Sequence, residues 1–413
     1  MLAKLTLSLL LSASLAASAQ SGCPDPQATN YNPTATNNDG SCQYAVTTVA
    51  LPLKTKLADE VPESSGLLYT GGQLWTFNDS GNAPVLFRVD STDGHVVQRV
   101  RLTNVANVDW EDITADAQYV YVGDFGNNNG DRRDLRVLRV PKAALGAAAD
   151  TASARAIAFS YPDQTDFTPR TNRHNFDCEA FFFANDSLHL FTKNWVDLQT
   201  RYYTIPAAPG TYVAHYKGTF NVNGLVTAAA LNAPGSAASL LGYNASNGTT
   251  FLWLLSGFRN NQFLRANKRR IELPSALAIG QAEGLCFVDR YRVFVSNEQL
   301  NVPFFTVPAQ LYSLAVGRWL APTALAGRAA SAAPSFIVVP NPAAHALHIE
   351  RGSGPLEVVR LVLQDLQGRT VLTATLPANG QAQDVDLGTV RAGTYVLKLV
   401  GKQRTFSQKV TVE

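Results

Sequence analysis

The sequence predicts an all-β protein, with a five-bladed β-propeller over residues 44–320 and a small seven-stranded immunoglobulin-like sandwich over residues 335–413. A strand pattern repeats along the first region, and short β-branched runs alternate with turn residues in the second. Composition agrees, since 16% of residues are charged and 46% are hydrophobic, as in aromatic-rich proteins outside the cytoplasm. The net charge of +2 provides no electrostatic footprint for nucleic acid or an anionic membrane.

The N-terminus predicts secretion. Lys4 precedes the apolar run 5–16, and small residues follow at 17–19, the pattern of a cleaved signal peptide over residues 1–19. The alternative is a lipoprotein acylated at Cys23. No other apolar stretch reaches the roughly 18 residues that a membrane-spanning helix needs.

Residues 20–43 predict a small disulfide-closed module. Cys23 and Cys42 bracket a polar, turn-rich stretch, and a disulfide closing such a loop contributes roughly 3 kcal/mol in the chain-entropy model. The stretch resembles a cysteine-bracketed module of secreted proteins from bacteria with type IX secretion. Two interpretations are open: an Asx-rich turn loop, or a Ca²⁺ site with ligands from Asp25, Asn30, Asn37 and Asp39.

The repeat begins with an acidic residue that opens a short apolar strand, followed by a turn and a second strand with a polar end. It starts at Glu63, Glu111, Glu179 and Glu283. The long interval before Glu283 requires a further repeat, and residues 226–231 supply one that lacks the acid. The last repeat is one strand short, so residues 46–56 are expected to complete its blade and close the ring. A six-bladed ring is the alternative, with extra strands between residues 160 and 176.

First strands of propeller blades line the central channel, so the repeat glutamates are expected to meet at one mouth. Crowded carboxylates cannot all stay charged unless their negative charge is compensated. A cation could compensate it, and surroundings made only of oxygen atoms favour Ca²⁺. The tentative metal ligands are Glu63, Glu111, Glu179 and Glu283, and the wider channel set adds Asn78, Asp124, Lys193 and Asn297. The alternative is that each glutamate binds the backbone of a neighbouring blade.

Catalytic signatures are few. The sequence has no GxSxG, HExxH, Walker A or CxxC motif. Carboxylate pairs remain, Asp109 with Glu111 and Asp177 with Glu179, which could act as acid and base in glycoside or phosphoester hydrolysis. No catalytic residue is therefore assigned.

Residues 321–334 are rich in alanine and predict a linker. Beyond it, ordered motifs fall at suitable distances: Pro340-Asn341-Pro342, Asp365 with Gly368, and Gly393 with Tyr395. These motifs resemble the type A C-terminal sorting domain of the type IX secretion system. The resemblance implies export through Sec and then the outer membrane, to the cell surface or the medium. It also implies recognition of residues 335–413 by the outer-membrane translocon and a sortase-like peptidase. An ordinary adhesion module is the alternative.

The repeats resemble, more weakly, secreted propellers of the SdiA-regulated and esterase-like phytase type, on the EGL at Glu283 and the EAF at Glu179. Two functions are therefore open for the propeller. One is binding of a glycan, peptide or small molecule at the polar mouth, with Trp75, Trp110 or Trp195 as stacking surfaces. The other is a Ca²⁺-dependent phytase-like or lactonase-like hydrolase.

Overall fold

The structure is a computed structural model that describes residues 20–320, 336–351, 359–365, 367–377, 382–401 and 405–413. The predicted signal peptide and the predicted linker 321–334 lie outside the described residues. The chain divides into two compact units, Met1–Thr323 and Ala324–Glu413. Each is described by itself below.

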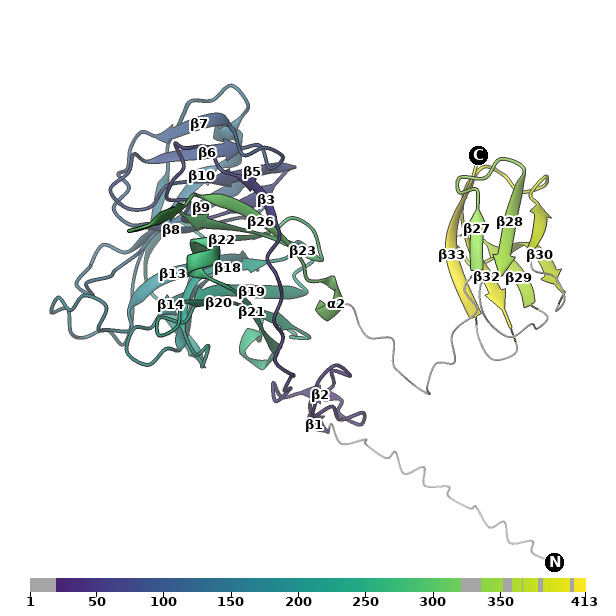
Figure 1. Cartoon of the computed structure of the whole chain (residues 1–413), viewed down its shortest axis with the longest axis horizontal. Coiled ribbons are helices and arrows are strands. Elements are labelled where there is room, and N and C mark those ends of the chain that lie inside the picture. Colours follow the sequence, from purple (N-terminus) through teal and green to yellow (C-terminus); the bar gives the residue numbers. More distant parts are fainter. Residues whose placement is uncertain (1–19, 321–335, 352–358, 366, 378–381, 402–404) are drawn as a thin grey trace, which may run out of the picture. The chain divides into compact units, whose positions relative to one another are not determined.

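The first unit consists of antiparallel sheets that follow one another along the chain (Figure 1). Each sheet starts at its inner strand and proceeds outward. The first three sheets are β4(Leu68–Thr70)-β5(Gln73–Thr76)-β6(Val85–Val89)-β7(Val96–Leu102), β8(Trp110–Ala115)-β9(Tyr119–Asp124)-β10(Arg136–Pro141)-β12(Arg155–Ser160) and β13(Asp177–Ala184)-β14(Ser187–Lys193)-β15(Thr200–Pro206)-β17(His215–Phe220). The next two are β18(Leu225–Leu231)-β19(Ala237–Tyr243)-β20(Thr249–Ser256)-β21(Asn267–Ser275) and β22(Gln281–Phe287)-β23(Arg292–Glu298)-β26(Gln310–Ala315)-β3(Leu53–Lys56).

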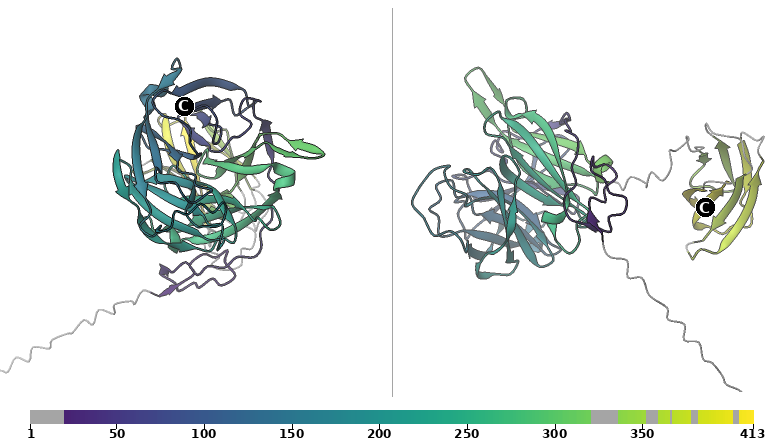
Figure 2. Two further views of the ribbon diagram at one scale, coloured as in Figure 1. Left: turned by 90° about the vertical axis from the view of Figure 1, so that its left-hand side faces the viewer. Right: turned by 90° about the horizontal axis from the view of Figure 1, so that it is seen from below.

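The inner strands surround a narrow channel. Strands β4, β8, β13, β18 and β22 contact one another in that order, and β22 contacts β4 again. Figure 2 shows the sheets radiating from this centre. The arrangement is a β-propeller, as predicted. Residues 161–176, where the six-bladed alternative needs strands, contain none.

The first strand of the propeller, β3, closes the ring. Strand β3 pairs antiparallel with β26, with Lys56 opposite Gln310 and Leu53 opposite Tyr312. The predicted joining of the two ends of the propeller in one sheet is therefore confirmed.

Other short segments cover the outer edges of three sheets. Strand β11(Thr151–Ala152) pairs with β7, and β16(Gly210–Val213) pairs with β12. Thr48 forms a parallel bridge with Glu272 of β21. Each added segment satisfies backbone groups that an open edge would expose to other chains.

Apolar and aromatic side chains fill the spaces between the sheets. Phe125 and Phe181, which lie on neighbouring sheets, are both fully buried, with ring centroids 5.1 Å apart. Burying one such side chain contributes about 1.5–3 kcal/mol. The described helices of this unit are single turns: η1(Lys142–Leu145), η2(Phe263–Arg265), α1(Ala276–Ile279) and α2(Gly317–Leu320). A hairpin of β24(Leu300–Val302) and β25(Phe305–Val307) projects from the ring, as Figure 2 shows.

The N-terminal module is closed by the Cys23–Cys42 disulfide, as predicted, and carries the short strands β1(Ser21–Gly22) and β2(Asn37–Asn38). The side chains proposed as Ca²⁺ ligands bind the module itself. Asp25 accepts hydrogen bonds from the Gln27 N–H and the Tyr44 hydroxyl, and Asp39 accepts one from the Ser41 N–H. These contacts favour the Asx-turn interpretation over the Ca²⁺ alternative.

The described residues of the second unit form seven strands in two sheets, as predicted: β27(Phe336–Val339)-β28(Ala346–Arg351)-β31(Ala382–Asp386) and β30(Thr370–Leu376)-β29(Val359–Gln364)-β32(Gly393–Val400)-β33(Thr405–Val412). The two sheets enclose a core that includes Leu347, Ile349, Leu361 and Leu397, all almost fully buried. Alternation of apolar and polar residues along β32 places one face on this core.

Candidate functional site

A β-bulge near the start of the inner strands sets the geometry of one channel mouth. The register with the second strand shifts by one residue at Glu179, Thr227 and Glu283, and in the stretch that holds Glu111. In the first sheet the shift lies between the Ser64–Asn78 bridge and the Leu68–Trp75 pair. A bulge changes the direction in which a side chain points. The bulges of the inner strands turn the bulge residues toward the channel.

Three of the four predicted glutamates and the predicted lysine gather at this mouth. Glu111, Glu179 and Glu283 are between 2% and 4% exposed, and Lys193 is 5% exposed. The Lys193 ammonium lies 3.1 Å from Glu179 Oε2. Glu283 accepts hydrogen bonds from Gln281 and from the Ser65 hydroxyl. These three acids, each from a different repeat, therefore lie at the same mouth.

Glu63 does not belong to the buried group. It is exposed and accepts a hydrogen bond from Asn82. The register explains the difference, because Glu63 occupies the position two residues before the bulge, equivalent to Asp109 and Asp177. The residue equivalent to Glu179 in the first sheet is Ser65.

Three other predicted channel residues use their polar atoms in the scaffold. Asp124 is fully buried and pairs with Arg132 at 3.2 Å and Arg136 at 2.8 Å. Asn78 binds the backbone of Glu60 and Glu63. Asn297 binds the backbone at Glu298, Pro308 and Gln310.

Two of the three tryptophans proposed as stacking surfaces are core residues. Trp110 is fully buried and Trp75 is 2% exposed. Trp195 is half-buried, with its indole N–H donating to Asp177 Oδ2 at 2.8 Å, and Lys193 lies 5.1 Å from its ring centroid. Trp195 therefore stands beside the acids at the mouth, together with Tyr243, whose ring is 5.7 Å from the same ammonium.

The sequence did not point to Asp79. Its carboxylate lies with those of Asp109 and Glu111 in a group whose ligand oxygens are all within 4.8 Å of one another. Asp79 is the cross-strand neighbour of Glu63, as Lys193 is of Asp177. The sequence signal that could have found it is its place directly after Asn78, beyond the end of β5.

Gly126 allows this group to form. A Cβ atom there would lie 2.1 Å from Glu111 Oε1 and 2.5 Å from Asp109 Oδ2. The backbone therefore approaches the two carboxylates more closely than any other residue type permits.

The carboxyl groups resist ionisation together. Burial, followed by repulsion from Glu283, raises the pKa of Asp79 to about 7. Burial and Asp177 raise the pKa of Asp109 to about 6, and burial and Glu179 hold the pKa of Glu111 well above its usual range. Burial alone would lower the pKa of Lys193, but the surrounding acids, Glu179 first, raise it above its usual value.

These shifts predict that chelator-treated protein loses stability as the pH rises. The native pKa values of Asp79 and Asp109, about 7 and about 6, exceed the unfolded value of about 4. The native state therefore binds more protons than the unfolded state between these limits, and its stability falls from about pH 4 to pH 7. Thermal melts in EDTA should show this slope, and Asp79→Asn should flatten it. A melting temperature that rises over this range would contradict the prediction.

Gly126→Ala is expected to disturb the carboxylates and leave the fold intact. The new methyl meets the ends of flexible side chains, which can move, so the melting temperature in EDTA should change little. The displaced oxygens should raise the midpoint concentration of any stabilisation by added Ca²⁺ at least tenfold, and melts across a calcium series measure that midpoint. Gly146→Ala is the control, since the nearest atom to its added Cβ lies 3.9 Å away and its φ is −55°.

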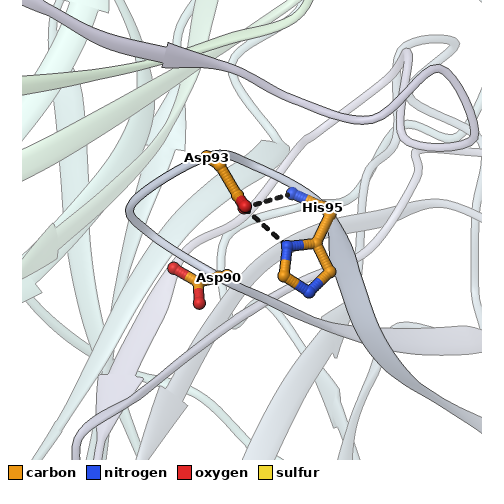
Figure 3. Close-up of side chains that lie close together, drawn as sticks. All are labelled: Asp90, Asp93 and His95. Carbon is orange, nitrogen blue, oxygen red and sulfur yellow. Dashed lines mark hydrogen bonds and ion pairs between the residues drawn. The ribbon is translucent and has the colours of Figure 1, made fainter.

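A second group of potential ligands lies on the turn between β6 and β7. Figure 3 shows Asp93 bonded to the backbone N–H of His95 at 3.2 Å and to its Nδ1 at 2.6 Å. Asp90 accepts a hydrogen bond from the Thr92 N–H at 2.7 Å. These bonds close an exposed turn and account for the clustering of the three side chains.

The predicted sorting motifs have defined contacts in the second unit. Asn341, between Pro340 and Pro342, donates to the Lys409 carbonyl and accepts from the Thr411 N–H, both at 2.9 Å. Asp365 accepts from the Gln367 and Arg369 N–H groups, and Gly368 has a φ of +81° in this turn.

The Gly393–Tyr395 motif at the start of β32 is also anchored, since the Tyr395 hydroxyl donates to the Arg391 carbonyl at 2.7 Å. The secretion system C-terminal sorting domain matches residues 338–413. This part of the chain is a type IX sorting domain. The sorting domain marks the chain as cargo of the type IX machinery, exported to the cell surface or the extracellular space. No helix among the described residues has the length and hydropathy of a membrane span.

Comparison with solved structures gives matches at low sequence identity and low TM-score. An exo-β-1,3-galactanase from Phanerochaete chrysosporium has a TM-score of 0.43 at 10% identity, covering 87% of this chain and 100% of that one. A putative 6-phosphogluconolactonase from Bacteroides uniformis has 0.32 at 11%, covering 80% and 90%. A GH43_1 enzyme from Xanthomonas citri has 0.37 at 9%, covering 63% and 89%. No curated protein matches the chain.

Proposed function

We propose that the acidic mouth of the propeller binds Ca²⁺ through Asp79, Asp109 and Glu111. The observation that carries the proposal is the convergence of these three carboxylates, with ligand oxygens within 4.8 Å of one another. Glu111 is 4% exposed and accepts no hydrogen bond from the described residues. A buried carboxylate without a donor is costly, and a divalent cation would offset that cost.

The donor set fits a hard cation. All three side chains offer carboxylate oxygen, which Ca²⁺ prefers, and no histidine or thiol is among them. Glu179 and Asp177 have other partners, Lys193 and Trp195. Of the ligands expected from the sequence, Glu63, Glu111, Glu179 and Glu283, the proposed site keeps only Glu111. Asp79 and Asp109 complete it.

We further propose that the occupied mouth binds a glycan. Ca²⁺ takes six to eight oxygen ligands, so three carboxylates leave positions for the hydroxyls of a sugar. Trp195 and Tyr243 flank Lys193 beside the cluster, and aromatic rings of this kind offer apolar faces with polar edges. The ion pair with Glu179 fixes the Lys193 ammonium beside the Trp195 and Tyr243 rings.

A metal-assisted hydrolase is the second candidate. Hydrolysis of glycosides requires a pair of carboxyl groups. Asp177 and Glu179 are not ligands in the proposed Ca²⁺ site and could supply that pair. When bound, Ca²⁺ would supply charge stabilisation. Asp177 accepts hydrogen bonds from the Asn127 N–H and the Trp195 indole, which hold its carboxylate in place.

The test is calorimetric titration of the full chain with Ca²⁺, then a glycan array in Ca²⁺ and in EDTA. The proposal expects one Ca²⁺ per chain, weaker Mg²⁺ binding, and glycan signals that EDTA abolishes. Reducing sugar released from a bound glycan would select the hydrolase. Absence of Ca²⁺ binding would overturn both candidates.

For the sorting domain we propose recognition by the outer-membrane translocon and a sortase-like peptidase, through the surface that carries Pro340, Asn341 and Pro342. Asn341 ties this opening to β33 through two hydrogen bonds. Asn341→Ala should reduce the secreted fraction of the protein in a type IX host, whereas deletion of residues 335–413 should abolish it. Cell fractionation measures both.

A further inference from the structure

A second pocket lies on the flank of the propeller and shares no residue with the acidic mouth. Its volume is about 420 Å³, and it is lined by β14, β15 and β17 of one sheet and by the loop before β21 of the next. This size lies within the usual range for small-molecule sites. The lining includes buried His189 and Tyr202, and exposed Lys217 and Arg265.

The lining carries an uncompensated positive charge. Lys217 and Arg265 are its two cations, and no acidic residue lines the pocket. Neither cation forms an ion pair with any side chain in the described ranges. Two free cations at one cavity favour an anionic group, which they can bind by charge-assisted hydrogen bonds.

The floor of the pocket offers a fixed hydroxyl. His189 Nε2 lies 3.2 Å from the Ala184 carbonyl, so this nitrogen carries the proton and donates. His189 Nδ1 then accepts from the Tyr202 hydroxyl at 2.6 Å. Burial, with a contribution from Lys217, lowers the pKa of His189 to about 4, which keeps the ring neutral. The Tyr202 oxygen therefore retains lone pairs for a hydroxyl of a ligand.

Packing holds that floor rigid. The Tyr202 ring stacks on Phe191 with centroids 5.0 Å apart and on His189 with centroids 5.8 Å apart. The hydroxyls of Ser187 and Thr204 also line the pocket and have no hydrogen-bond partner among the described residues. A pocket with neutral hydroxyl partners at its floor and cations in its lining matches a compound that carries both hydroxyls and an anionic substituent.

We infer that this flank pocket binds an acidic saccharide, a sugar ring bearing a carboxylate or a sulfate. Lys217 and Arg265 bind the anionic substituent, and Tyr202, Ser187 and Thr204 bind ring hydroxyls. The pocket needs no metal, so the inference stands apart from the Ca²⁺ proposal. The exported chain would then hold a charged polysaccharide at a place other than its channel mouth.

The test is calorimetric binding to the full chain in EDTA, which silences the proposed Ca²⁺ site. The probes are trigalacturonate, its methyl ester as a neutral counterpart, galactose 6-sulfate, and inorganic sulfate. The inference expects binding of trigalacturonate or galactose 6-sulfate, and the preferred one identifies the anionic substituent. The ester and inorganic sulfate should bind at least tenfold more weakly, and affinity should fall with added salt.

The variants assign the binding to this pocket. Lys217→Gln with Arg265→Gln should weaken binding at least tenfold, and Arg155→Gln, an exposed arginine on the outer strand β12, should leave it unchanged. Tyr202→Phe should weaken binding severalfold, with thermal melts to verify folding. Three results would each overturn the inference: no binding of either acidic sugar, equal binding of the ester or of inorganic sulfate, or binding unaffected by the double variant.

Discussion

Glu111→Gln is expected to change stability in opposite directions with and without Ca²⁺. In EDTA the neutral amide removes one buried carboxyl from a crowd that includes Glu179, Asp79 and Asp109, so the variant should melt above the parent at pH 8. With Ca²⁺ at 100 times its Kd, the parent gains about 2.7 kcal/mol. At about 2–4 °C per kcal/mol, the parent should then melt several degrees above the variant.

This crossover separates a metal site from a purely structural role for the glutamate. A structural glutamate that binds a neighbouring backbone would lose stability on substitution in both conditions. Glu63→Gln is the matched control, because it removes the same charge from an exposed repeat position. Differential scanning fluorimetry in EDTA and in Ca²⁺ measures all three proteins. Parallel shifts of Glu111→Gln in the two buffers would refute the site.

Asp112→Ala is expected to be the most destabilising single change in the propeller. The fully buried carboxylate of Asp112 accepts N–H groups from Phe181 and Ala229, each at 3.0 Å, and from Ile113 at 2.8 Å. It therefore joins three inner strands across the channel. Alanine leaves buried donors without acceptors, each costing about 1–3 kcal/mol, so the unfolding free energy should fall by about 3–6 kcal/mol.

Urea denaturation of the full chain measures this loss. Asp112→Asn keeps one acceptor oxygen and should lose less than Asp112→Ala, although its amide faces a backbone donor. Asp59→Ala is the control, since the Asp59 side chain is 88% exposed. A loss below about 1 kcal/mol for Asp112→Ala, typical of surface positions, would show that the bridge contributes little.

Strand patterns made most of the fold predictable. The sandwich predicted over residues 335–413 is present as the strands β27 to β33, because turn residues mark strand ends and alternation marks strand faces. Ring closure was also predictable, because the last repeat lacked a strand and Leu53–Lys56 could supply it. What the patterns could not show were β11 and β16, which pair with the outer strands β7 and β12.

The site was only partly predictable, and the bulge explains why. Strand alternation assigns one face to every second residue, but a one-residue bulge changes that assignment partway along the strand. Glu63 was therefore aligned with Glu179, although Ser65 occupies that position. Strand alternation also gave no reason to select Asp112, which follows Glu111 directly. Asp79 lies beyond the end of the second strand β5, and the search for polar residues there selected its neighbour Asn78 instead.

The pairing of β3 with β26 has a consequence for the order in which the chain can fold. The first strand of the propeller finds its partner only after residues 310–315 have emerged, so ring closure joins the most distant segments and carries the largest loop entropy. Until β3 pairs with it, β26 has an open edge, which is prone to pairing with other chains. A fragment beginning after Lys56 would keep that edge permanently and should aggregate, whereas removal of residues 321–413 leaves the pairing of β3 with β26 intact and should not cause aggregation.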